Sequence, residues 1–143
     1  MFLVGFPLLI IPFAIYNMIA FLLPGITWSQ EIVRVQLMSG ADWSCTPGEL
    51  LIALAAIVLW LEMIKAMRIN SRSIIDHLLS TLLFIGMTAE FLLVKEAASG
   101  TFFLLLVISF VDVVGGFTMI RVAPRPVTVE SADPVAPPVN AQV

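Results

Sequence analysis

Residues 50–94 read LLIALAAIVLWLEMIKAM (50–67), RINSRS (68–73) and IIDHLLSTLLFIGMTAEFLLV (74–94). As a helix rising about 1.5 Å per residue, each apolar run is long enough to cross a hydrocarbon core of about 30 Å. Lipid offers no hydrogen-bond partners to the backbone, so both runs must close their hydrogen bonds internally as helices. The short connection makes the two helices antiparallel neighbours. The stretch therefore predicts a transmembrane helical hairpin.

Composition supports a membrane protein over a soluble one. The 143 residues are 60% hydrophobic and 12% charged, whereas soluble domains carry about 25% charged residues. The net charge of −3 comes from scattered residues, which argues against a nucleic-acid partner. One cysteine, Cys45, and one histidine, His77, exclude an intramolecular disulfide and a Cys/His zinc site within one chain. No cofactor is expected.

Two further apolar runs flank the central hairpin. Residues 2–23 carry no charge and end before Pro24-Gly25, which is a helix stop signal, while Pro12 predicts a kink. A cleaved signal peptide is the alternative for residues 2–23, but the run has no basic beginning and exceeds the usual 7 to 15 apolar residues. We therefore predict an all-α integral membrane protein with a four-transmembrane-helix bundle in residues 1–122. Its helices cover about 2–23, 47–67, 74–94 and 101–121.

The segment between the first two helices has a different period. Val33, Val35 and Leu37 alternate with polar or flexible residues, and Ser39-Gly40 supply a turn, so residues 31–46 predict a short extramembrane β-hairpin. An interfacial helix over residues 29–38 is the alternative. Trp28 and Trp43 are predicted interface anchors at headgroup level.

The ends of the predicted elements carry their own signals. Thr46, Pro47 and Glu49 form a capping box with proline at the first helical position. Residues 123–143 contain five prolines and no aromatic residue, which predicts a disordered tail.

Lysine and arginine counts predict the orientation. Five basic residues lie on the side of the 68–73 loop and two on the other, which places both termini in the cytoplasm. The absence of a glycosylation sequon favours a bacterial inner membrane, with the hairpin outside.

Ionisable residues within the spans are the candidate functional residues, because a charge at bilayer depth costs at least about 2.5 kcal/mol. They are Glu62, Glu90 and Asp112, with Asp112 nearest the middle of its helix. Asp112 shares a helix face with Thr101, Ser109 and Gly116, and Gly115 and Gly116 allow a partner helix to approach closely. Lys65, one turn from Glu62, gives that carboxylate an ion-pair explanation, and Glu90 can reach the outer interface.

The third predicted helix carries a polar stripe on one face. Its members are Ser73, His77, Ser80, Thr81, Thr88 and Lys95, with Asp76 beside His77. The functional interpretation is a lining for water, ions or a substrate that Asp112 faces. The structural interpretation is that the hydroxyls bond to neighbouring helices or to their own backbone.

Two functions remain, and both make the bilayer and other membrane subunits, or a second copy, the expected partners. The first is an accessory, scaffold or assembly subunit acting through its helices and hairpin. The second is an oligomeric ion or proton pathway that uses Asp112 and the polar stripe. An enzyme is not expected, because the sequence has no catalytic set at a plausible depth, metal cluster or phosphate loop.

Overall fold

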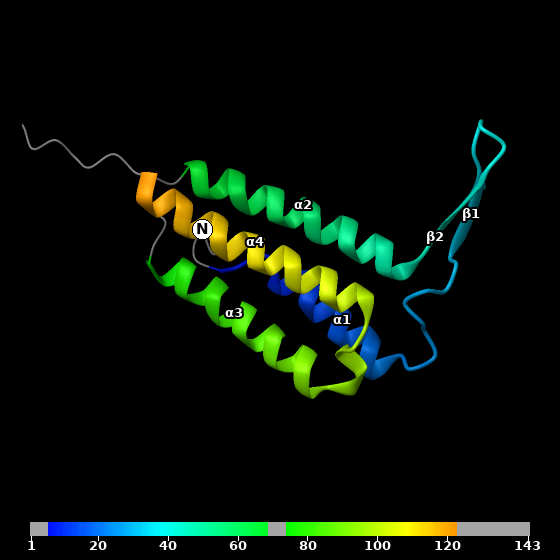
Figure 1. Ribbon diagram of the computed structural model, residues 1–143, viewed down its shortest axis with the longest axis horizontal. Helices are drawn as coiled ribbons and strands as arrows, with labels where there is room; N and C mark the ends of the chain where they lie inside the picture. The colour runs from blue at the N-terminus through cyan, green and yellow to red at the C-terminus, as the bar shows by residue number, and fades with distance from the viewer. Residues whose placement is uncertain (1–5, 69–73, 123–143) are drawn as a thin grey trace, which may run out of the picture.

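A computed structural model describes residues 6–68 and 74–122 of the chain. In order, the elements are α1 (Ile10–Leu22), β1 (Val33–Gln36), β2 (Asp42–Cys45), α2 (Pro47–Arg68), α3 (Ile74–Leu93), the 3-10 turn η1 (Lys95–Ala97) and α4 (Gly100–Val122). The helices lie side by side with α4 between α2 and α3, and the β-hairpin stands off one end (Figure 1). We call this end of the helix packing the hairpin end. The end at which α2 and α4 finish is called the opposite end.

Three of the helices are long and apolar enough to cross a membrane. The candidate spans are Pro47–Lys65, Ile75–Leu93 and Gly100–Thr118. The helices that contain them begin and end within one residue of the ranges predicted from sequence. The predicted disordered tail, residues 123–143, lies outside the described residues.

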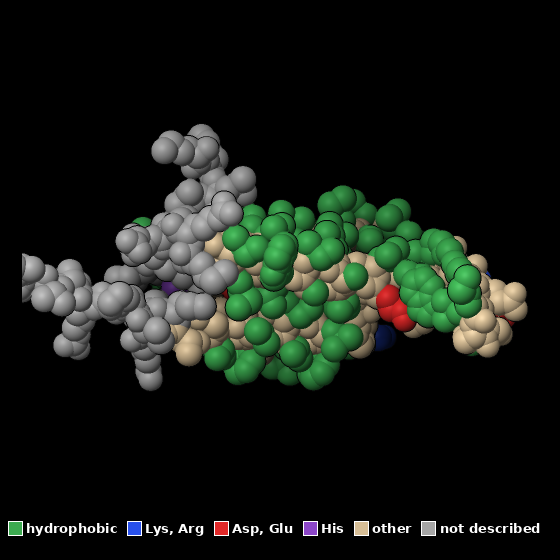
Figure 2. Space-filling model, turned by 90° about the horizontal axis from the view of Figure 1, so that it is seen from above, with side chains coloured by type: hydrophobic (Ala, Val, Ile, Leu, Met, Phe, Trp, Pro, Cys, Tyr) green, Lys and Arg blue, Asp and Glu red, His purple; other side chains and the backbone are tan. Residues whose placement is uncertain are grey.

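The outside of the helix packing is apolar and its inside is partly polar. Large apolar side chains such as Ile57, Leu82 and Phe110 are more than half exposed, and hydrophobic side chains cover the visible face over the helices (Figure 2). Glu62, His77, Ser80, Ser109 and Asp112 are the buried polar or charged residues in the described part of the chain. So large an exposed apolar surface is unusual for a soluble protein and suits a lipid environment.

The first helix is shorter than predicted. It begins at Ile10, after a turn in which Ile10 N–H donates to the Pro7 carbonyl, whereas the sequence predicted residues 2–23, of which 2–5 lie outside the described residues. Pro12 is the third residue of α1, where a backbone N–H has no partner within the helix. Proline is tolerated in the first turn of a helix. Pro12 therefore belongs to the start of α1 and not to the middle of the helix, where the sequence predicted a kink.

The predicted β-hairpin is confirmed. Its antiparallel register pairs Val33 with Cys45 and Val35 with Trp43. Leu37 N–H donates to the Ala41 carbonyl and Gly40 N–H to that of Leu37. Gly40 has φ of 83°, a left-handed conformation that glycine adopts without a steric penalty.

The predicted capping box also forms at the start of α2. Glu49 N–H donates to Thr46 Oγ1 at 3.3 Å, and Thr46 N–H donates to Glu49 Oε2 at 2.9 Å. Two amides without a partner inside the helix are thereby satisfied, which fixes where the hairpin ends and α2 begins.

Candidate functional site

Aromatic pairs that repeat every seven residues mark the register of α3 against α4. His77 meets Phe117 at a centroid distance of 3.9 Å, Phe84 meets Phe110 at 5.7 Å, and Phe91 meets Phe103 at 6.1 Å. Seven residues are two helical turns, so successive pairs stand above one another along antiparallel helices. His77 occupies the position in this ladder where the other two pairs have phenylalanine.

Helices α2 and α4 run in the same direction and approach closely at the hairpin end. A Cβ atom added at Gly48 would overlap Thr101 Oγ1. Glu62 lies fourteen residues beyond Gly48, and Gly115 lies fourteen residues beyond Thr101. The two residues therefore lie at a similar level along the parallel helices. The inward face of α2 continues from Leu51 through Ala55 and Val58 to Glu62, all of them buried.

These registers bring the buried polar residues to one part of the fold. We call Glu62, His77, Ser80, Ser109 and Asp112 the polar tier. Asp112 is 4% exposed, Glu62 5% and His77 9%. Along the helix axis, Glu62 lies about 4.5 Å and the His77–Phe117 pair about 7.5 Å from the level of Asp112, towards the opposite end. Each of the three long helices contributes at least one member.

Asp112 lies in the middle of the buried face of α4. Phe102, Leu105, Ser109, Asp112 and Gly116 form that face, and all are buried. Their spacing of three or four residues follows the helical period. The face predicted from sequence around Asp112 thus includes Ser109 and Gly116. A Cβ atom added at Gly115 would meet no described atom within 4 Å.

Chemically, the polar tier offers two carboxylates, an imidazole and two hydroxyls away from solvent. Groups of this kind hold and pass protons or bind polar partners inside membranes. Within residues 6–68 and 74–122, no three His, Cys, Asp or Glu side chains gather in a way that could hold a metal ion.

Other predicted site residues lie elsewhere. Glu90 Oε2 accepts a hydrogen bond from Asn17 Nδ2 of α1 at 3.3 Å, so this carboxylate binds a neighbouring helix at the hairpin end. Thr81 Oγ1 donates to the His77 carbonyl and Thr88 Oγ1 to the Phe84 carbonyl, each at 2.8 Å. Hydroxyls that bond to their own helix in this way favour the structural interpretation of the polar stripe on α3.

The remaining polar residues around α2 and α3 differ in their setting. Asp76 is half-buried in the first turn of α3, and Ser73 of the predicted polar stripe lies outside the described residues. Lys95 is exposed in η1. Lys65 Nζ donates to the Phe6 carbonyl at 3.3 Å, while Glu62 is directed into the core.

The hairpin end is organised around Tyr16. We call Phe13, Tyr16, Trp28, Phe91 and Phe102 the aromatic core. The Tyr16 ring stacks on Trp28 at a centroid distance of 4.4 Å and meets Phe102 at 4.8 Å. The Tyr16 hydroxyl donates to the Glu96 carbonyl at 3.0 Å and lies 2.7 Å from Ser99 Oγ. Trp28 thus packs within the protein, whereas Trp43 is half-exposed on the hairpin.

Sequence reasoning missed two features of this arrangement. The seven-residue spacing of His77, Phe84 and Phe91, repeated in Phe103, Phe110 and Phe117, is visible in the sequence and could have given the α3–α4 register. The contact of Tyr16 with Ser99 joins residues 83 positions apart, and no local signal indicates it.

Searches against models of protein families, curated proteins and solved structures found no match for this chain.

Proposed function

We propose that the chain is a small multi-pass membrane protein whose four helices lie in the bilayer, and that it acts as an accessory or scaffold subunit of a membrane assembly. The observation that carries this proposal is the exposed apolar face of the hairpin. The proposal assigns the chain no reaction and requires no cofactor.

The hairpin has two chemically different faces. The register puts Val33, Val35, Trp43 and Cys45 on one face and Arg34, Gln36, Asp42 and Ser44 on the other. Val35 is 44% exposed and Trp43 49% exposed, although both lie at the centre of the apolar face. An isolated two-stranded hairpin is marginally stable in water. A partner protein that covers this face would stabilise the hairpin and gain a recognition surface.

Photocrosslinking from the two faces tests the proposal. A photoreactive residue is placed at Val35, on the apolar face, or at its chain neighbour Gln36, on the polar face, in cells that make the protein. We expect a discrete protein adduct from position 35 and little from position 36, because successive strand residues point to opposite sides. Adducts from position 35 that contain only lipid would contradict the scaffold function.

The proposed orientation places the hairpin outside a bacterial inner membrane and both termini in the cytoplasm. The lysine and arginine distribution supports this orientation. Cys45 is buried, so a better reporter is Met38→Cys at the exposed hairpin turn in a Cys45→Ser background. A maleimide that does not cross membranes should label it in intact cells. Labelling that requires permeabilised cells would reverse the orientation.

The polar tier favours a second candidate function, an ion or proton pathway through an oligomer. Asp112→Asn keeps an acceptor and adds donors, so a role in packing alone predicts little loss of assembly; interhelical hydrogen bonds in membranes average about 0.6 kcal/mol. If Asp112 instead carries protons or cations, the same variant loses a pH-dependent or cation-dependent flux in vesicles while it stays folded. A wild-type protein without flux under any imposed gradient would exclude the pathway.

A further inference from the structure

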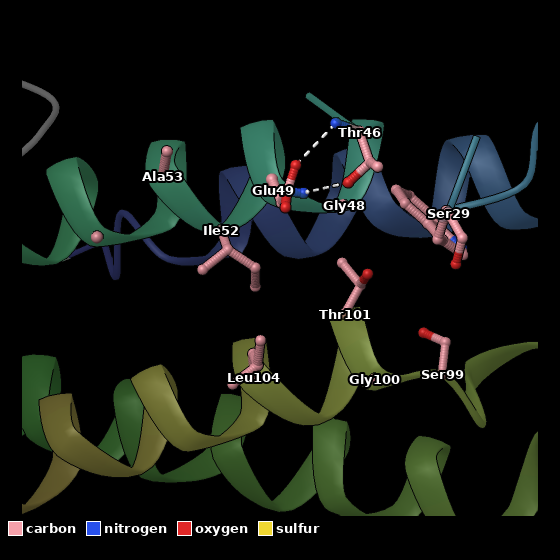
Figure 3. Close-up of a pocket in the computed structure, with 12 residues that line it drawn as sticks. Ser29, Thr46, Gly48, Glu49, Ile52, Ala53, Ser99, Gly100, Thr101 and Leu104 are labelled. Carbon is pink, nitrogen blue, oxygen red and sulfur yellow. Dashed lines mark hydrogen bonds between the residues drawn. The ribbon is translucent and has the colours of Figure 1, made fainter. Parts of the chain in front are cut away.

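A cavity of about 630 Å³ opens between the first turns of α2 and α4. Ile52 of α2 points across it towards Leu104 of α4, and Thr101 of α4 points towards α2 (Figure 3). The cavity lies at the hairpin end, and its volume falls within the range of about 300–1,000 Å³ that is typical of small-molecule sites.

The lining changes from polar to apolar along the helices. We call its polar lining residues, Ser29, Thr46, Glu49, Ser99 and Thr101, the mouth, and four of its apolar lining residues, Ile52, Ala53, Ala56 and Leu104, the floor. Ala56 is seven residues from Glu49, or about 10 Å along α2. The floor therefore belongs to the candidate membrane spans Pro47–Lys65 and Gly100–Thr118, and the mouth lies at their boundary. A ligand that fits both zones is an amphiphile.

The charge at the mouth selects the polar end of that amphiphile. Within the described part of the chain, Glu49 is the one charged residue that lines the cavity. One of its oxygens, Oε2, accepts the Thr46 amide in the capping box. The carboxylate charge therefore favours a cationic group that donates hydrogen bonds. The hydroxyls of Ser29 and Thr101 can donate to phosphate oxygens beside it.

We propose that this cavity binds a membrane phospholipid with a protonated primary amine in its headgroup. The ammonium group donates to Glu49, the phosphate accepts from the hydroxyls of Ser29 and Thr101, and the upper part of an acyl chain lies on the floor formed by Ile52, Ala56 and Leu104. A quaternary amine has no N–H to donate, and an anionic headgroup without an amine is repelled by the carboxylate. This site does not depend on the scaffold function.

The test uses the full chain reconstituted in vesicles that contain equal amounts of phosphatidylethanolamine, phosphatidylcholine and phosphatidylglycerol. After extraction in mild detergent, native mass spectrometry counts each lipid that remains on the protein. We expect phosphatidylethanolamine to be retained several-fold above the other two. Equal retention of the three lipids, retention of none, or a dimer without lipid would overturn the proposal.

Two variants test the contact with the lipid headgroup and the contact with the acyl chain separately. Glu49→Gln keeps an acceptor for the Thr46 amide, since glutamine also completes a capping box, but it removes the charge. It should lower the preference for phosphatidylethanolamine by about tenfold, the effect of one charge-assisted hydrogen bond. Ala56→Phe fills the floor and should remove retained lipid of every class.

Ala89→Phe is the matched control, because Ala89 is exposed on α3 and does not line the cavity. It should retain phosphatidylethanolamine as the wild type does. If Ala56→Phe fails to fold, Glu49→Gln decides the outcome, and an unchanged lipid preference in that variant overturns the proposed site.

Discussion

The two ends of the helix packing bury different kinds of side chain. At the hairpin end, the aromatic core packs rings against one another, and its polar group, the Tyr16 hydroxyl, is satisfied by Ser99 and the Glu96 carbonyl. Towards the opposite end, the polar tier buries two carboxylates and an imidazole. Packed rings need complementary shape but no hydrogen-bond or charge partner, whereas burying a charge in a membrane costs free energy. The aromatic core therefore accounts for stability, and the polar tier is where a function other than stability is to be sought.

The largest expected effect is at the centre of the aromatic core. Phe102 is fully buried and meets the rings of Phe13, Tyr16 and Phe91. Phe102→Ala should lower the free energy of unfolding by about 3 kcal/mol, because the cavity it leaves is enclosed by rigid rings. Reversible denaturation in mixed micelles measures the change.

The neighbouring residue supplies the control for this prediction. Phe103 is 50% exposed, so Phe103→Ala should cost less than about 1 kcal/mol, since lipid or detergent refills the space. Equal losses for the two variants would show that the hairpin end is not held by its aromatic core.

A smaller effect is expected where α2 meets α4. A Cβ atom added at Gly48 would overlap Thr101 Oγ1 and would lie 3.1 Å from the Trp28 carbonyl oxygen. Gly48→Ala should therefore cost about 1–2 kcal/mol, despite the better helix propensity of alanine. The same substitution at Gly86 of α3, where no described atom lies within 4 Å, should be neutral or stabilising by up to about 1 kcal/mol.

Thermal unfolding of the two glycine variants checks the prediction. Adding Thr101→Ala to Gly48→Ala should restore part of the loss, because it removes the nearer of the two obstructing atoms. A Gly48→Ala variant as stable as the wild type would mean that α2 and α4 are not closely packed at the hairpin end.

The comparison of the two ends also shows what sequence alone can predict. The long helices were predictable because their apolar runs end at local signals, such as the Thr46–Glu49 capping box. The start of α1 was not, since no polar or charged residue interrupts its apolar run through residues 2–9. Burial of Asp112 followed from its place on one face of α4. The stacking of Trp28 on Tyr16 did not follow from the sequence, because it is a tertiary contact that local pattern cannot reveal.

The smallest expected effect concerns Thr81 and Thr88 of the polar stripe on α3 and tests whether these threonines act together with the polar tier. The hydroxyls of Thr81 and Thr88 donate to backbone carbonyls four residues earlier on α3. Replacing both with valine keeps their shape and removes a bond that contributes little to helix stability. We expect the free energy of unfolding to change by less than about 0.5 kcal/mol. Any vesicle flux that depends on Asp112 should also persist in this double variant. Loss of flux with stability retained would instead make the threonines part of a continuous polar path that includes the polar tier.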